Sequence, residues 1–151
     1  MNTDKKISRR EALKRMGFAV MSSAIASSGL LSLASCETKR SKRIIFYFTG
    51  TGNSLYIARQ LAGENAELLS IPQMVKRGKY EFEADEIGIV YPIYGHMPPY
   101  MVRQFIQKAK LKAEYKFAVL TYGARKCDAV EIWDRISRKA DNAFDYINTI
   151  I

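Results

Sequence analysis

The chain is poor in the residues that most often carry metal or acid–base chemistry, with two cysteines and one histidine among 151 residues. Two cysteines are too few for the thiolate cluster of an iron–sulfur centre. A single histidine, His96, leaves no evident set of serine, histidine and aspartate for hydrolysis. No stripe of basic residues alternates with aromatic ones, as a nucleic-acid surface would require. These absences disfavour iron–sulfur, hydrolytic and nucleic-acid-binding functions.

The N-terminal region also lacks an uninterrupted apolar run. A transmembrane helix needs about 20 strongly apolar residues, whereas residues 17–34 are fewer and are diluted by small and polar ones, namely Ser22, Ser23, Ser27, Ser28, Gly29 and Ser32. A basic, polar segment precedes this stretch, and residues 39–43 are basic again. This outline is that of an export signal, and a permanent membrane span is the weaker alternative.

Two short motifs refine the export prediction. Residues 8–14 read Ser-Arg-Arg-Glu-Ala-Leu-Lys and resemble the twin-arginine motif, with Ala12 where phenylalanine is usual. That route exports folded proteins, so a cofactor can be inserted in the cytoplasm first. Residues 33–36, Leu-Ala-Ser-Cys, resemble a bacterial lipobox, whose cysteine accepts a diacylglycerol and becomes the first mature residue. The alternatives for Cys36 are a spectator thiol or a disulfide with Cys127.

These motifs predict three parts: a signal peptide at 1–35, a basic tether at 36–43 and one globular domain at 44–151. The whole chain has a net charge of +9, but residues 36–151 hold 18 basic and 13 acidic residues and carry only +5. Lys39, Arg40, Lys42 and Arg43 supply much of that charge beside the expected anchor. We therefore expect export to the periplasmic side of the cell envelope, with a lipid anchor at Cys36 and a tether facing the membrane.

Apolar runs alternate with amphipathic segments along the rest of the chain. Expected strands are 44–48, 67–71, 87–91, 117–121 and 144–151, the last with Tyr146 and Ile147 as its core. The first expected helix is capped by Asn53 or Ser54, and the second begins at Pro98 or Pro99. The third begins at Asp128, whose side chain would form a capping box with Glu131. Residues 72–85 are expected to be a crossover loop with room for one helical turn. This alternation predicts an α/β fold with a parallel sheet covered on both faces.

The loop after the first strand, Thr49-Gly50-Thr51-Gly52-Asn53-Ser54, is suited to a phosphate. Backbone N–H groups, three hydroxyls and the positive end of a helix could all bind the anion there, and the glycines permit close approach. The loop lacks the Gly-Lys-Ser/Thr ending of a P-loop, and Leu55 occupies the third glycine position of a Rossmann fingerprint. A hydroxyl-rich turn that only caps the helix is the alternative.

This loop resembles the phosphate loop of flavodoxins, since Thr49, Thr51, Gly52 and Ser54 match each of its fixed positions. Residues 91–99 (Tyr-Pro-Ile-Tyr-Gly-His-Met-Pro-Pro) and 120–123 (Leu-Thr-Tyr-Gly) resemble the second and third flavin loops in the flavodoxin-like part of bacterial ferredoxin–flavodoxin fusion proteins. The resemblance implies a three-layer doubly wound sheet of order 2-1-3-4-5 that binds flavin mononucleotide (FMN). Beyond the phosphate loop, the implied cofactor-binding residues are Pro92, Ile93, Tyr94, Gly95, His96, Thr121, Tyr122, Gly123 and Ala124.

Within that resemblance, Tyr94 or Tyr122 would stack on the flavin, although both rings could instead pack within their loops. The chain departs from the family at Ala124, Arg125 and Lys126, where relatives usually have more glycine. The bulkier side chains could block the flavin, or the two cations could stabilise its anionic reduced form. The family's later Met-Pro-x-Asn-Tyr segment and last helix have no match here, so the domain is either truncated or poorly covered on one face.

The leading hypothesis is therefore an exported, membrane-tethered FMN protein that exchanges electrons with a redox partner protein or a small donor or acceptor. An electron carrier or a flavin-dependent oxidoreductase is expected rather than a hydrolase, and no catalytic residue or metal ligand is predicted. The competing hypothesis is a lipoprotein that keeps the flavodoxin-like shape without a cofactor, as a binding or structural module or a truncated remnant.

Overall fold

The computed structural model describes residues 42–151. The twin-arginine motif, the lipobox with Cys36 and most of the basic tether therefore lie outside the described residues. Among the residues that are described, none belongs to a helix with the length and apolarity needed to cross a membrane.

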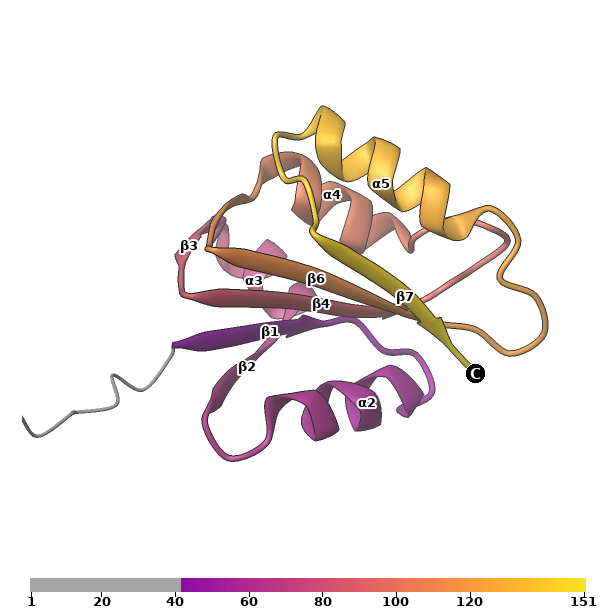
Figure 1. Ribbon diagram of the computed structural model, residues 1–151, viewed down its shortest axis with the longest axis horizontal. Coiled ribbons are helices and arrows are strands. Elements are labelled where there is room, and N and C mark those ends of the chain that lie inside the picture. Colours follow the sequence, from indigo (N-terminus) through magenta and orange to yellow (C-terminus); the bar gives the residue numbers. More distant parts are fainter. Residues whose placement is uncertain (1–41) are drawn as a thin grey trace, which may run out of the picture. The chain divides into compact units, whose positions relative to one another are not determined.

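The domain is built on a parallel sheet of five strands (Figure 1). Its strands are β1 (Arg43–Tyr47), β2 (Ala66–Ser70), β4 (Glu86–Pro92), β6 (Tyr115–Thr121) and β7 (Tyr146–Ile150). They lie in the order β2-β1-β4-β6-β7, and every neighbouring pair is parallel. Counted within this sheet alone, the order is 2-1-3-4-5, which confirms the predicted topology.

Helices cover both faces of the sheet and give three layers (Figure 1). Helix α2 (Asn53–Ala62) packs on one face, and α3 (Ile71–Arg77), α4 (Tyr100–Lys108) and α5 (Ala129–Lys139) pack on the other. Side chains alternate between the faces along each strand: Ile44 and Phe46 of β1 join the core under α3, α4 and α5, whereas Ile45 faces α2. The predicted doubly wound α/β architecture is thus confirmed.

Aromatic rings make up much of the core under α4 and α5. Phe46 meets Phe82 and Phe105 with ring centroids 4.7 and 5.0 Å apart. Trp133 of α5 lies 5.0 Å from the ring of Tyr91 and 5.3 Å from Phe144. Large buried aromatic groups supply much of the burial that stabilises a domain of this size.

The prediction of a crossover loop with one helical turn at 72–85 is incomplete. That segment contains most of α3 and a short strand, β3 (Glu81–Glu83), which pairs in parallel with β5 (Lys110–Lys112) in a separate two-stranded sheet. Each short strand has one buried apolar residue at its centre, flanked by charges. Pairs of lysine and glutamate cross between the strands with N–O distances of 2.7 Å. These contacts are between segments far apart in sequence, so local pattern does not reveal them.

Two smaller predictions also need correction. Helix α4, expected to begin at Pro98 or Pro99, begins at Tyr100, and Pro99 is its N-cap rather than part of its first turn. Tyr146 is not a core residue, because 49% of its surface is exposed, and Phe144, just before the strand, takes the buried position instead. Ile147 is half-buried and does pack against the core.

The face of the sheet that carries α2 is incompletely covered at β6 and β7. Phe117 and Val119 of β6 pack beside α2 but stay half-buried. Tyr146 and Ile150 of β7 are in register with Phe117 and Thr121 and so share their face, where both are exposed. A patch of apolar side chains therefore remains open to solvent on this side.

Candidate functional site

Three loops meet where β1, β4 and β6 end, because the carboxyl ends of parallel strands share one edge of the sheet. They enclose a pocket of about 490 Å³. The pocket is lined by Gly50, Thr51, Asn53, Ser54, Tyr56, Ile57, Pro92, Ile93, Tyr94, Thr121, Tyr122, Gly123 and Ile151. The structure thus brings together residues of all three loops that the sequence singled out.

The first loop leaves the start of α2 open towards the pocket. Gly52 is the N-cap, with a left-handed φ of 100°, and its N–H donates to the Thr49 hydroxyl over 2.9 Å. No side chain caps the helix, so the predicted cap by Asn53 or Ser54 is wrong. No acidic residue lies in its first turn, and the N–H groups of residues 53–55 reach no protein acceptor among the described residues. An oxyanion at this position would accept these hydrogen bonds and meet the positive end of the helix dipole.

A buried hydroxyl pair joins the first loop to the third. The Ser54 and Thr121 side-chain oxygens share a hydrogen bond of 2.8 Å, and the two residues are only 2% and 7% exposed. Together with the bond from Gly52 to Thr49, this leaves Thr51 as the loop hydroxyl with no protein partner among the described residues. This bond links two residues that line the pocket from different loops.

The second loop is a tight hairpin that presents Tyr94 to the pocket. Backbone bonds of 3.0 and 3.1 Å link Tyr94 with Met97, and the two residues between them, Gly95 and His96, both have positive φ, 54° and 74°. Such a two-residue turn suits glycine but is unusual for histidine. The Tyr94 hydroxyl reaches over Gly50, where an added Cβ would lie only 2.5 Å from it. Gly50 is therefore the residue that lets the two loops come together.

His96 does not line the pocket and instead contacts Asp128. Its Nδ1 lies 3.1 Å from Oδ1 of Asp128, and both side chains are exposed. The hydrogen bond from His96, followed by a backbone bond within Asp128, lowers the pKa of that carboxyl. Asp128 is the N-cap of α5 but makes no side-chain capping bond, so the predicted capping box with Glu131 is wrong.

The third loop contributes Tyr122, whose backbone N–H donates to the Ile150 carbonyl over 3.0 Å. Its ring is half-buried, whereas 52% of Tyr94 is exposed. Ala124, Arg125 and Lys126 are exposed and do not line the pocket.

Five of the predicted cofactor-binding residues lie outside the lining of the pocket: Thr49, Gly52, Gly95, His96 and Ala124. Thr49 and Gly52 shape the first loop, and Gly95 and His96 form the turn of the second. Conversely, Tyr56, Ile57 and Ile151 line the pocket without having been predicted. The helical spacing of Asn53, Tyr56 and Ile57, three and four residues apart, is a signal that could have revealed two of them.

The pocket therefore combines uncharged donors at a helix start with two tyrosines in its lining. This suits a ligand with a terminal phosphate and a planar aromatic part. Within residues 42–151, no group of three or more histidine, cysteine, aspartate or glutamate side chains is placed to hold a metal ion.

No family model matches the sequence, and no curated protein is similar to it. Among solved structures, a flavoprotein from Lactobacillus acidophilus in complex with FMN matches with a TM-score of 0.53 and 12% identity, over 72% of this chain and 93% of that one. A provisionally named flavoprotein from Bacteroides eggerthii matches with a TM-score of 0.56 and 17% identity, over 73% and 88%. Two-electron reduced flavodoxin from Megasphaera elsdenii matches with a TM-score of 0.52 and 16% identity, over 71% and 84%. At these identities the similarity concerns the fold, which is flavodoxin-like.

Proposed function

We propose that this chain binds FMN at the three-loop pocket and transfers electrons at the cell envelope. The observation that supports this best is the uncapped start of α2, which faces a pocket lined by Thr51, Tyr94 and Tyr122. Proteins of similar fold include one solved in complex with FMN and one flavodoxin, which makes FMN the first ligand to test.

The chain's own residues would divide the work of binding. The N–H groups of residues 53–55 and the Thr51 hydroxyl would hold the phosphate, where neutral donors and the helix dipole offset its charge. Tyr94 and Tyr122 would flank the ring system, and N–H groups of the second and third loops would adjust its electronic properties. When bound, the flavin supplies reversible electron uptake, and the protein supplies orientation and access.

The binding claim is tested by titrating the full chain with FMN and following flavin absorbance, fluorescence and thermal unfolding. Binding to the folded state must raise the unfolding midpoint as FMN concentration rises. Riboflavin, which lacks the phosphate, is the matched control ligand and is expected to bind much more weakly. Unchanged flavin spectra and an unchanged midpoint at excess FMN would disprove the proposal.

A cofactor-free binding or structural module is the second candidate. It is favoured by two bonds inside the protein that use donors near the phosphate position: the Gly52 N–H donates to the Thr49 hydroxyl, and one hydroxyl of the Ser54–Thr121 pair donates to the other. The same titration separates the two functions, since this candidate predicts no saturable FMN binding.

Export and anchoring form a separate part of the proposal and depend on residues outside the structure. Arg9 and Arg10 would direct export by the twin-arginine route, and Cys36 would carry the lipid. Replacing both arginines with lysine is expected to retain the chain in the cytoplasm. Cys36→Ala is expected to abolish incorporation of a labelled fatty acid and to release the exported chain from membranes. Cys127→Ala is the control and should leave both unchanged.

A further inference from the structure

A second pocket, of about 580 Å³, lies between α4 and α5 and is rich in positive charge. Arg103 and Gln107 line it from α4, Arg135 and Lys139 line it from α5, and Met97 and Ile136 add apolar surface. No aspartate or glutamate is among the lining residues. We call this pocket the α4–α5 groove.

The cations of the α4–α5 groove make no salt bridge within the described residues, although the Arg103 guanidinium lies over the Tyr100 ring at 6.0 Å. The charge of Arg135 also adds to the hydrogen bond from His96 in lowering the pKa of Asp128. Arg103, Arg135 and Lys139 have no carboxylate oxygen within 4.0 Å among the described residues, whereas Arg138 on the same helix pairs with Asp134 at 2.8 Å. The Nε of Arg103 is buried and has no hydrogen-bond partner in this part of the chain. Buried donors are normally paired, so this N–H lacks the acceptor that such groups usually have.

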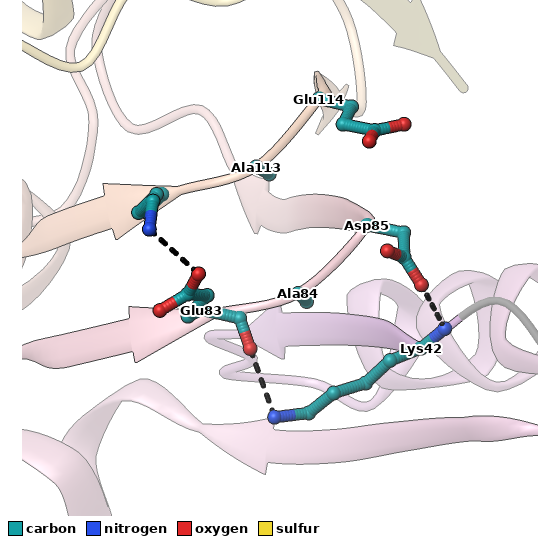
Figure 2. A pocket seen from close by; sticks show the side chains of 7 residues that line it. Lys42, Glu83, Ala84, Asp85, Ala113 and Glu114 are labelled. Atoms are coloured by element: carbon teal, nitrogen blue, oxygen red, sulfur yellow. Dashed lines mark hydrogen bonds and ion pairs between the residues drawn. The ribbon is translucent and has the colours of Figure 1, made fainter.

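A pocket beside the starts of β1, β4 and β6 shows the contrast (Figure 2). Both of its cations are engaged: the Lys42 ammonium donates to the Glu83 carbonyl over 2.8 Å, and Lys112 donates to the Glu83 carboxylate over 2.7 Å. The Lys42 backbone N–H also donates to Asp85 over 2.6 Å. The cations of that pocket are satisfied within the domain, whereas those of the α4–α5 groove make no salt bridge in the described structure.

The arrangement of side chains in the groove sets the kind of anion that fits. Arg135 and Lys139 are one helical turn apart and so lie on the same side of α5, opposite Arg103 on α4. Two guanidinium groups can each form paired bonds with an oxyanion, and the ammonium adds a third charge. One negative charge would leave two cations unmatched, so the ligand should carry at least two.

We propose that the α4–α5 groove binds a small multivalent oxyanion, either a phosphate ester or a di- or tricarboxylate. Gln107 supplies a neutral donor, and Met97 with Ile136 offers an apolar surface to the carbon part of the ligand. This site is distinct from the three-loop pocket and does not depend on flavin binding. The two adjoin, however, because Met97 of the groove pairs with Tyr94 of the pocket in one hairpin.

The test is isothermal titration of the full chain with sodium pyrophosphate, citrate and acetate at constant ionic strength. The groove variant R135Q/K139Q is compared with K76Q/R77Q, which removes the same two residue types from exposed positions at the end of α3. We expect pyrophosphate, citrate or both to saturate one site, with affinity at least tenfold lower in the groove variant and within twofold of wild type in the control. Acetate, with one charge, should bind far more weakly.

Each result decides the matter. Preference for pyrophosphate identifies phosphate esters as the ligand class, preference for citrate identifies polycarboxylates, and equal binding supports the shared oxyanion chemistry. Equal loss in both variants would reveal general charge attraction and overturn the proposal, as would failure of all three anions to bind. FMN is itself a phosphate ester with two charges, so its phosphate can also enter the groove. Quenching of flavin fluorescence by Tyr94 and Tyr122 reports the three-loop pocket alone. The groove variant should keep this quenching, which separates the present proposal from the flavin proposal.

Discussion

Replacing Ser54 with alanine is expected to destabilise the fold by about 1–3 kcal/mol, although the change removes a single oxygen atom. Ser54 is 2% exposed, and its hydroxyl shares a 2.8 Å bond with that of Thr121, which is 7% exposed. The alanine variant would leave the Thr121 hydroxyl buried without that partner. Ser54 is the second residue of α2, so the better helix propensity of alanine offsets about half a kcal/mol of the loss.

A double-mutant cycle isolates this bond. Thr121→Val keeps the side-chain shape and orphans Ser54 instead, so it should also be destabilising. In S54A/T121V neither hydroxyl remains, and the combined loss should fall short of the summed single losses by about 1 kcal/mol. Thr149→Val removes the same hydroxyl from a half-buried strand position that makes no side-chain hydrogen bond in the described structure, and should change stability by no more than about 0.5 kcal/mol.

Urea unfolding of the full chain, followed by circular dichroism and by the fluorescence of Trp133, measures the free energy of unfolding of the wild type and of each variant. Trp133 is the one tryptophan in the sequence and is fully buried, so its emission reports directly on core exposure. Strict additivity of the two single losses would refute the coupling. If each single variant lost less than about 0.3 kcal/mol of unfolding free energy, the hydrogen bond between the two hydroxyls would contribute no measurable stability.

Three further outcomes are expected. Thr51→Val should weaken FMN binding about tenfold or more, because a hydrogen bond to a charged group contributes about 1.5 kcal/mol or more; equal affinity in fluorescence titrations would mean that the phosphate lies elsewhere. Gly88→Ala should lower stability by about 1 kcal/mol, since its Cβ would lie 2.5 Å from the Phe117 ring. That ring is half-buried and can move outwards, so Phe117→Leu in the same chain should restore part of the loss, and a Gly88→Ala melt identical to wild type would contradict the contact. Hydrogen bonds from Lys110 and Lys112, followed by the positive charge of these lysines, lower the pKa of Glu81 and Glu83 below the usual 4.5. The stability that the two ionised carboxylates contribute is therefore complete above pH 4.5 and is lost as the pH falls through the lowered pKa values. Urea midpoints at pH 6 and pH 3.5 should therefore differ less in E81Q/E83Q than in wild type, and an equal difference would argue against these pairs.

The strands and loops that form the pocket could be predicted because their signals are local. Residues 44–48 form a continuous apolar run that ends at a Thr-Gly pair, and a helix pattern follows at once. Parallel strands need such runs because both of their faces are buried. The positions of the three loops then follow from the sheet topology alone, without knowledge of any side-chain contact.

What could not be predicted depends on contacts between distant segments. Strands β3 and β5 each bury one apolar residue and are held to one another by charge pairs, so neither has a strand pattern of its own. The Asp128 side chain could cap its helix, but His96, which precedes it by 32 residues, binds it instead. Tyr146 and Ile147 are neighbours in β7, so their side chains point to opposite faces of the sheet. The sequence does not show which face is covered, and only the position of α5 decides that Ile147 is the one that packs against the core.

Because β6 and β7 are incompletely covered on the α2 side, the two faces of the sheet bury different amounts of apolar surface. The side beneath α3, α4 and α5 holds Trp133, Tyr91 and the phenylalanine cluster, whereas the α2 side buries chiefly Ile45, Val90 and small alanines. Amide hydrogen exchange should accordingly be faster in α2 than in the other helices, because α2 buries the least apolar surface against the sheet. An anion bound at the start of α2 would stabilise this helix against local unfolding. Protection of the α2 amides from exchange should therefore increase with ligand occupancy.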